Sequence, residues 1–133
     1  MQDNASQLIA IVDDDESVRE ATTSLLRSYG LRAETFSSAE AFLNSSLLVK
    51  TRCLLLDIGM PGMGGLELQR HLAGEGWRIP IIFITARDDQ ESRNDAMREG
   101  AVDFLSKPFS EQALLKAVRQ ALKSSPSDER KTP

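Results

Sequence analysis

The sequence predicts an α/β protein with a doubly wound, five-stranded parallel sheet. Five short apolar runs recur along the chain: Leu8–Val12, Leu31–Phe36, Cys53–Leu56, Ile81–Ile84 and Ala101–Leu105. The centres of successive runs lie about 21 to 27 residues apart, which is too long for hairpins and suits strand–helix–strand units. The third and fourth runs are apolar throughout, as expected of strands covered by helices on both faces. From periodicity alone the order of the strands in the sheet stays open.

The first two intervening segments carry helix signals. Six residues recur at helical spacing and share one face: Val18, Ala21, Thr22, Leu25, Leu26 and Tyr29. Gly30 follows them as the expected C-cap. Ser38 precedes Ala39–Leu43 and is the expected N-cap of a short second helix.

The remaining helices differ in how much they have to bury. A third helix is expected from Gly65 to Ala73. The last helix is expected after Ser110, because Leu114, Leu115, Val118, Ala121 and Leu122 share a face. Between Asp88 and Glu99, by contrast, only Ala96 and Met97 are apolar. A helix with so little to bury is expected to be weakly anchored and easily displaced.

Composition limits the classes of function. A chain of 133 residues suits one domain, and we expect it to cover residues 1–123, with a polar tail or linker at 124–133. The formal net charge of −4 argues against nucleic-acid binding by this segment. One cysteine, Cys53, and one histidine, His71, leave little for a disulfide, a zinc site or a Ser-His-Asp triad. Since no apolar run approaches the length of a membrane span, we expect a cytoplasmic protein without membrane contact.

Polar side chains follow four of the predicted strands. Asp13, Asp14 and Asp15 follow the first run, Asp57 follows the third, Thr85 the fourth, and Ser106, Lys107 and Pro108 the fifth. The carboxyl ends of parallel strands share one edge of a sheet, which is where ligands bind. Each residue taken singly has a plainer interpretation, since acidic residues after a strand often only begin a helix. The coincidence of several strand ends favours a site.

These residue types together suit phosphoryl transfer. Crowded carboxylates repel one another unless a cation lies among them, and oxygen ligands suit Mg²⁺. The Lys107 ammonium suits a phosphoryl oxygen, and the Thr85 hydroxyl is a hydrogen-bond donor. A carboxylate such as that of Asp57 is itself a nucleophile that forms an aspartyl-phosphate.

Four motifs resemble those of receiver domains of two-component response regulators. They are Ile11-Val12-Asp13-Asp14-Asp15, Leu56-Asp57-Ile58-Gly59-Met60-Pro61-Gly62-Met63-Gly64-Gly65, Ile84-Thr85-Ala86 and Phe104-Leu105-Ser106-Lys107-Pro108-Phe109. The resemblance runs from about Leu8 to Lys123 and implies a flavodoxin-like sheet of order 2-1-3-4-5. It also implies a signalling module that catalyses only its own phosphorylation and dephosphorylation.

The resemblance implies a role for each site residue. Asp57 matches the phosphoacceptor, while Asp13 and Asp14 match the acidic pair that holds Mg²⁺ together with Asp57 and the backbone carbonyl of Gly59. Lys107 matches the phosphate-pairing lysine, and its bond to Pro108 resembles one that is cis in this family. Thr85 and Phe104 match the switch pair. Phosphorylation is expected to draw Thr85 toward the phosphoryl group and let Phe104 turn inward.

The resemblance also implies partners. A sensor histidine kinase is the expected phosphodonor. Two segments, Ser38–Leu43 and Gly100–Phe104, resemble the subfamily in which a helix-turn-helix output domain follows the receiver, so DNA would be bound only through an output domain that is not in this chain. Phosphorylation is expected to repack the face formed by the fourth helix, fifth strand and fifth helix, and to lead either to a homodimer through that face or to release of an attached effector.

One alternative function stays open, and one residue departs from the pattern of many receiver domains. A phosphohydrolase of the haloacid-dehalogenase type also uses a strand-end Asp with a second Asp two residues later, a spacing met by Asp13 and Asp15, but it leaves Asp57 unexplained. Gly59 leaves the site less shielded than in many receivers, and Arg87 is the expected shield against hydrolysis.

Overall fold

The computed structural model describes residues 7–86 and 90–124. Five parallel strands form one sheet in the order β2-β1-β3-β4-β5, as the resemblance implied. The strands are β1 (Leu8–Val12), β2 (Arg32–Phe36), β3 (Thr51–Leu56), β4 (Ile81–Thr85) and β5 (Asp103–Ser106). The helices are α1 (Glu16–Ser28), α2 (Ala39–Leu43), α3 (Gly65–Gly74), α4 (Gln90–Arg98) and α5 (Glu111–Ser124), and a short 3₁₀ turn at Leu48–Lys50 precedes β3.

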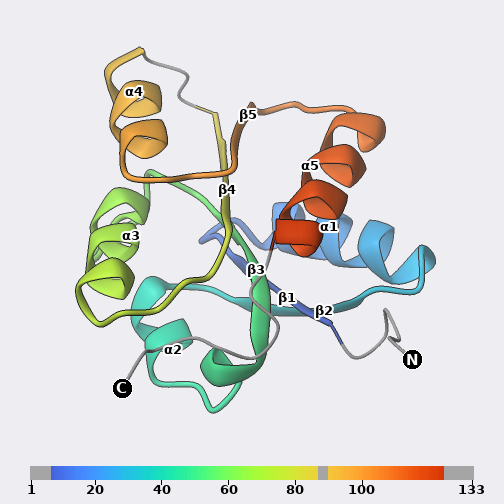
Figure 1. Ribbon diagram of the computed structural model, residues 1–133. Coiled ribbons are helices and arrows are strands. Elements are labelled where there is room, and N and C mark those ends of the chain that lie inside the picture. Colours follow the sequence, from blue (N-terminus) through green and yellow to red (C-terminus); the bar gives the residue numbers. More distant parts are fainter. Residues whose placement is uncertain (1–6, 87–89, 125–133) are drawn as a thin grey trace.

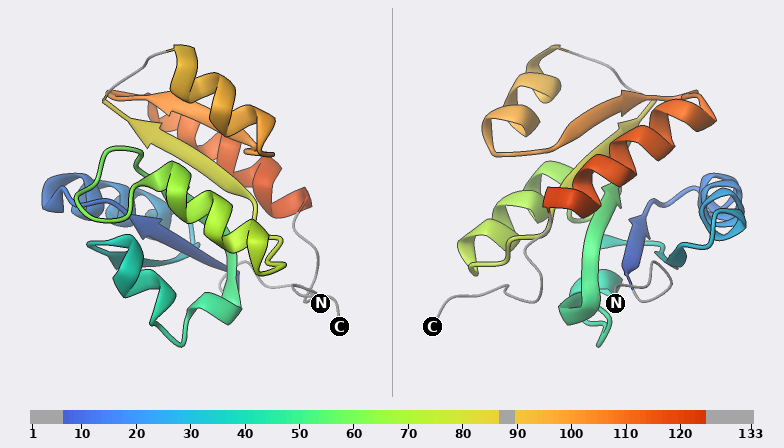
Figure 2. Two further views of the ribbon diagram at one scale, coloured as in Figure 1. Left: turned by 90° about the vertical axis from the view of Figure 1, so that its left-hand side faces the viewer. Right: turned by 45° about the vertical axis from the view of Figure 1, so that its right-hand side comes forward.

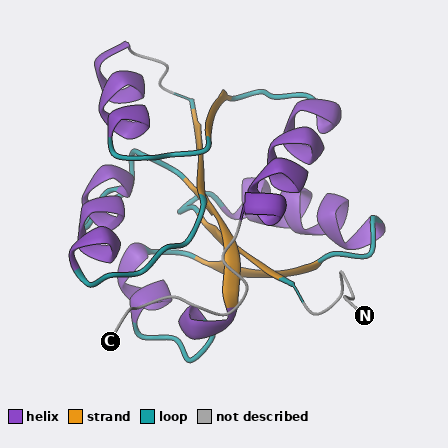
Figure 3. Cartoon of the chain, in the orientation of Figure 1, coloured by secondary structure: helices purple, strands orange, loops and turns teal. Residues whose placement is uncertain are grey.

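Helices cover both faces of the sheet (Figure 1). α1 and α5 lie on one face, and α2, α3 and α4 lie on the other, an arrangement that the two further views repeat (Figure 2). Each strand is followed along the chain by a helix, so the fold is built from successive strand–helix units (Figure 3).

The strands supply alternate residues to two hydrophobic layers, because successive side chains of a strand point to opposite faces. In β1, Ile9 and Ile11 pack with α1 and α5, whereas Ala10 and Val12 pack with α2, α3 and α4. Cys53 of β3 belongs to the first layer, is fully buried, and has its pKa raised to about 12 by that burial. The plain interpretation of Cys53 as a core residue is therefore the one that its surroundings support.

Two strands begin later than the apolar runs predicted. β2 begins at Arg32 rather than Leu31, and β5 begins at Asp103 rather than Ala101. In both cases the apolar residue closes the preceding helix: the N–H of Leu31 donates to the Leu26 carbonyl, and that of Ala101 donates to the Ala96 carbonyl, each at 3.1 Å. A glycine of positive φ precedes each of them, as the Schellman helix ending requires. Both residues are also buried in the hydrophobic layers, so they belong to the helix endings and the core but not to the strands.

Elsewhere the differences are small. The Ser38 hydroxyl accepts a hydrogen bond from the Ala41 N–H at 3.0 Å, as expected of the N-cap of α2. β3 begins two residues before the predicted Cys53, at Thr51. α5 continues to Ser124, one residue past the predicted end of the domain, and residues 125–133 of the expected linker lie outside the described residues. None of the helices described is long and apolar enough to cross a bilayer.

Candidate acidic site at the carboxyl edge of the sheet

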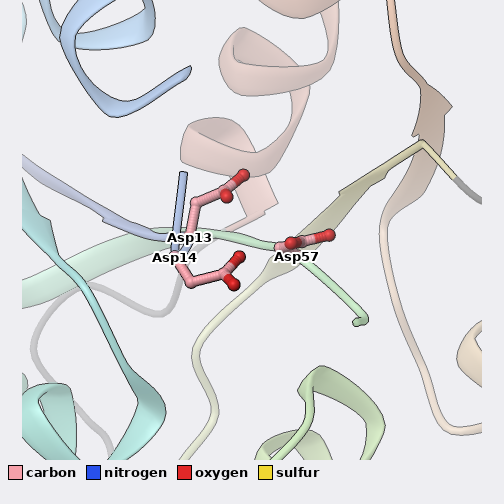
Figure 4. Close-up of side chains that lie close together, drawn as sticks. All are labelled: Asp13, Asp14 and Asp57. Carbon is pink, nitrogen blue, oxygen red and sulfur yellow. The ribbon is translucent and has the colours of Figure 1, made fainter. Parts of the chain in front are cut away.

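Three carboxylates meet where β1 and β3 end. The Asp57 N–H donates to the Val12 carbonyl at 3.0 Å, and the Asp13 N–H donates to the Phe36 carbonyl at 3.1 Å, so sheet-like pairing continues past the strand ends and fixes both backbones. One carboxylate oxygen each of Asp13, Asp14 and Asp57 lies within 4.8 Å of the other two, and Figure 4 shows the three side chains side by side. These are the three residues that the sequence analysis proposed as metal ligands through their side chains.

The site holds more negative than positive charge. Asp13 is fully buried and Asp57 is 6% exposed, whereas Asp14 is open to solvent. The Lys107 ammonium lies 3.0 Å from Asp13 Oδ2 and 4.0 Å from Asp57 Oδ1. Lys107 is therefore closer to the buried Asp13 than to the expected phosphoacceptor in this structure.

The pKa of Asp57 is raised from its ordinary value to about 6, first by burial and then by the neighbouring charge of Asp13. Asp14 raises the pKa further, while Lys107 and a backbone hydrogen bond from Gly59 lower it. A divalent cation would offset the charge repulsion that raises the pKa of Asp57. The oxygen-rich donor set fits Mg²⁺, which takes one or two carboxylates and retains waters.

Asp15 has a different role from its two neighbours. Its carboxylate caps α1, accepting hydrogen bonds from the Ser17 N–H at 2.9 Å and the Ser17 hydroxyl at 2.7 Å. These bonds, that of the Ser17 hydroxyl foremost, lower the pKa of Asp15. The plain interpretation of an acidic residue after a strand is thus correct for Asp15. An aspartate occupied as a helix cap is not placed to act as the second acid of a haloacid-dehalogenase site.

β4 and β5 bring a hydroxyl and an ammonium to the same edge. Thr85, the last residue of β4, is 2% exposed, and its carbonyl accepts a hydrogen bond from the Lys107 N–H at 2.7 Å. The Lys107–Pro108 peptide bond is cis. Sequence position alone thus placed Thr85 and Lys107 at the edge that also holds the carboxylates.

Phe104, the expected partner of Thr85 in the switch, lies on β5. Its side chain is buried at 3% exposure, 6.2 Å from Phe83 between ring centroids, and the Arg93 guanidinium of α4 lies 4.6 Å above its ring. The ring faces inward in this structure, and its movement on phosphorylation stays a prediction. The proposed shield Arg87 lies outside the described residues.

The loop after Asp57 turns closely around the strand end. A Cβ on Gly65 would collide with the Asp57 carbonyl and lie 2.9 Å from Ile58 Cα, so this position requires glycine. A Cβ on Gly59, by contrast, would meet nothing within 4 Å, in line with the expected lack of shielding. Two arginines also contact residues of this region. The Arg93 guanidinium lies over the Phe104 ring, and the Arg19 guanidinium donates a hydrogen bond to the Asp13 carbonyl at 2.8 Å. No sequence motif marked either arginine.

Comparison with known proteins gives a consistent result. The response regulator receiver domain family matches residues 9–119. The response regulator protein TmoT of Ectopseudomonas mendocina is 50% identical over 133 residues, which are all of this chain and 60% of the relative. The transcriptional regulatory protein FixJ of Azorhizobium caulinodans is 40% identical over 114 residues, 86% of this chain and 54% of the relative.

Solved structures agree with the sequence matches. The crystal structure of FixJ-N superposes with a TM-score of 0.83 at 36% identity, covering 96% of this chain and 99% of that one. This chain spans at most about 60% of the curated relatives named here. The haloacid-dehalogenase alternative receives no support from these matches. With an unbroken family match over most of the chain and the same fold in FixJ-N, the chain belongs to the response regulator receiver domain family.

Proposed function

We propose that this chain is a phosphorylation-controlled switch that accepts a phosphoryl group from a sensor histidine kinase onto Asp57, with Mg²⁺ as cofactor. The observation that carries the proposal is the placement of Asp57: it is nearly buried, adjoins two further carboxylates, and has an ammonium within 4.0 Å. A carboxylate with a pKa of about 6 is mostly ionised at neutral pH and is thus available as a nucleophile.

The residues have complementary roles in the transfer. An Asp57 carboxylate oxygen forms a bond to phosphorus as the phosphorus–nitrogen bond to the donor histidine breaks. Asp13, Asp14, Asp57 and the Gly59 carbonyl would hold Mg²⁺, which supplies positive charge for the phosphoryl oxygens. The Lys107 ammonium moves its pairing from Asp13 toward the incoming phosphoryl group, and the Thr85 hydroxyl donates a hydrogen bond to it. The chain catalyses only this transfer and the later hydrolysis, and does not turn over a separate substrate.

A small phosphodonor tests the proposal. Incubation with acetyl phosphate and Mg²⁺ should add one phosphate by intact mass, and the addition should be lost with EDTA or in Asp57→Asn. The matched variant Asp14→Asn should weaken Mg²⁺ binding, seen as a smaller Mg²⁺-induced rise in melting temperature. Labelling that persists in Asp57→Asn would exclude Asp57 as the acceptor.

A groove beside Lys107 supports the proposed kinase as partner. It lies between α1 and the start of α5, has a volume of about 600 Å³, and its lining includes Val18, Leu25 and Phe109. The groove borders the phosphorylation site and offers an apolar surface to a histidine-bearing helix. Ala21→Arg in the groove should slow transfer from a phosphorylated kinase and leave acetyl phosphate labelling unchanged.

The output of the switch belongs to the longer protein. Because TmoT and FixJ extend well beyond the matched region, we propose that residues 1–123 act as the receiver and that the following segment links it to a DNA-binding output domain in the cytoplasm. Phosphorylation would promote a homodimer through α4, β5 and α5. The exposed Met97 on α4, at 44% exposure, supports that face as the contact.

A further inference from the structure

Glu40 is an exposed carboxylate on α2 that contacts the loop between β3 and α3. Its Oε2 accepts a hydrogen bond from the Met63 N–H at 3.1 Å, across 23 positions of sequence. Gly62, beside Met63, has a φ of +73°, and a Cβ there would lie 3.0 Å from the same oxygen. The carboxylate therefore lies close against the tip of the loop, where the positive φ favours glycine.

The two ends of this loop are held by local contacts. The Gly65 N–H donates to the Ile58 carbonyl at 3.0 Å and closes the base of the loop. The Gly64 N–H donates to Glu67 Oε1 at 3.4 Å at the start of α3. Met60 is 8% exposed and packs in the layer of α2 and α3. The Met63 side chain also packs against this layer, and Glu40 adds the hydrogen bond from a separate element that holds the Met63 backbone at the tip.

Gly59 depends on the loop for its position. It lies on the exposed side of the loop, and its backbone hydrogen bond to Asp57 is among the influences that lower the pKa of that residue. It has no side chain that could anchor it by packing. Because Gly59 donates this hydrogen bond, and its carbonyl would hold Mg²⁺ under the proposed function, its backbone must be oriented by the contacts of its neighbours along the loop.

We infer that Glu40 is a positioning residue for the phosphoryl and metal site: by holding the N–H of Met63 it fixes the 58–64 loop and, through it, Gly59 beside Asp57. The inference rests on the proposed function, because it assigns Glu40 to the same site. Glu40 itself touches neither the carboxylates nor the reacting atoms in this arrangement, so its effect passes entirely through the loop backbone.

Removing the Glu40 carboxylate, which accepts the hydrogen bond from Met63, should weaken Mg²⁺ binding. Loss of partners beyond the ligands themselves commonly costs about 10- to 100-fold in metal affinity. Glu40 is exposed to solvent and contacts the loop rather than a proposed ligand. We therefore expect Glu40→Ala to raise the Mg²⁺ dissociation constant about 3- to 10-fold. Glu40→Gln retains an acceptor oxygen of similar reach and should stay within about twofold of the native value. Because Glu40 is exposed and alanine favours helix, both variants should fold.

The experiment measures two quantities in the full chain. Calorimetric titration with Mg²⁺ alone gives the dissociation constant, and amide exchange by NMR gives the protection of the Met63 N–H. Glu75→Ala is the matched control: it removes an exposed carboxylate at the far end of α3, where Glu75 pairs with His71 at 3.6 Å. It changes the net charge by the same amount without touching the loop.

The expected result is faster exchange at Met63 and weaker Mg²⁺ binding in Glu40→Ala, with Glu40→Gln and Glu75→Ala close to native. Unchanged Mg²⁺ affinity in Glu40→Ala, or unchanged Met63 exchange, overturns the inference while leaving the proposed function in place. An equal loss in Glu40→Gln overturns it too, because the charge rather than the hydrogen bond would be responsible. A native chain that binds no Mg²⁺ overturns both.

Discussion

α5 and α4 flank the same strand, β5, but they are held in different ways. α5 buries five residues against the sheet, and Leu114, Val118 and Ala121 among them are fully inaccessible. α4 buries Ala96 alone of its residues 90–98, and adds the Arg93 contact to Phe104 and a hydrogen bond from Gln69 of α3. α5 is therefore fixed mainly by buried apolar area, whereas α4 is held mainly by a few polar contacts.

This difference indicates which elements of the domain are more easily displaced. Apolar burial is lost only at a large cost in free energy, so we expect α5 and the central strands to resist displacement. Polar contacts of about 1 kcal/mol each can be exchanged for others when a charge is added nearby. If the proposed function holds, we expect a phosphoryl group to change the structure at the acidic edge and in α4.

The largest expected effect is in α5. Leu114→Ala should lower the free energy of unfolding by about 2–5 kcal/mol, because it deletes a fully buried side chain from a packed layer. Ala96→Gly in α4 is the comparison, with an expected loss of about 1 kcal/mol from helix propensity. Urea denaturation followed by circular dichroism measures both. Similar losses in the two variants would contradict the contrast between the helices.

At the acidic edge, removing a charge should raise the free energy of unfolding rather than lower it. The folded-state pKa of Asp57, about 6, lies above its ordinary value of 3.8, so the folded protein binds this proton more tightly than the unfolded chain does. Stability should therefore fall as pH rises from about 4 through 6, by about 1–3 kcal/mol, and the loss should persist at neutral pH.

Asp57→Asn should remove this slope and make the metal-free protein more stable at pH 7.5. Urea denaturation at pH 5 and 7.5 in EDTA compares the two chains, with Mg²⁺ expected to reduce their difference at pH 7.5. A metal-free Asp57→Asn chain that is less stable than the native chain at pH 7.5 would show that the charge at this edge is already compensated.

The contact between α3 and α4 should have a moderate effect. Gln69 is 3% exposed, its Nε2 donates to the Ala96 carbonyl at 3.1 Å, and its Oε1 is buried without a hydrogen-bond partner among the described residues. Gln69→Ala should cost about 1–2 kcal/mol, and Gln69→Leu less, because leucine fills the space and removes the unsatisfied oxygen. Both should speed amide exchange in α4. A Gln69→Leu variant with slower exchange in α4 would show that Gln69 does not tether this helix.

The smallest expected effect is at Arg93. Arg93→Ala should cost about 0.5–1 kcal/mol, the usual value of a cation–π contact, while Arg93→Lys should retain part of it. The informative measurement is amide exchange, which should rise in residues 90–98 and stay unchanged in α5. An equal rise in both helices would contradict a contact that is local to α4.

The sequence predicted the elements better than their contacts. Periodicity identified β1 and α2 with their observed bounds, but Leu31 and Ala101 were assigned to strands although they close helices. An apolar residue after a glycine serves either purpose, and local pattern does not separate them. The strand order came from resemblance to a family, since any order of five parallel strands leaves the same periodicity.

The site followed from one rule, that parallel strands end at a common edge, which was enough to place Asp13, Asp57, Thr85 and Lys107 together. The partners of these residues were not predictable in the same way. The position of Phe104 beneath Arg93, like the tether from Gln69, depends on how two helices pack across the sheet. Such contacts join residues far apart in sequence and leave no spacing for a pattern to reveal.

Cys53 provides an internal reporter of the opening of the central strands. The chain has this cysteine alone, it is fully buried in β3, and its pKa of about 12 keeps the thiol protonated at neutral pH. Only a thiolate reacts rapidly with alkylating reagents. The folded protein should therefore not react with iodoacetamide. Any slow alkylation of Cys53 should measure the rate or equilibrium of opening of the central strands. A second cysteine placed at the exposed Met97 would be alkylated in the folded protein, so it would confirm that the reagent is active while peptide mapping follows Cys53 in the same sample.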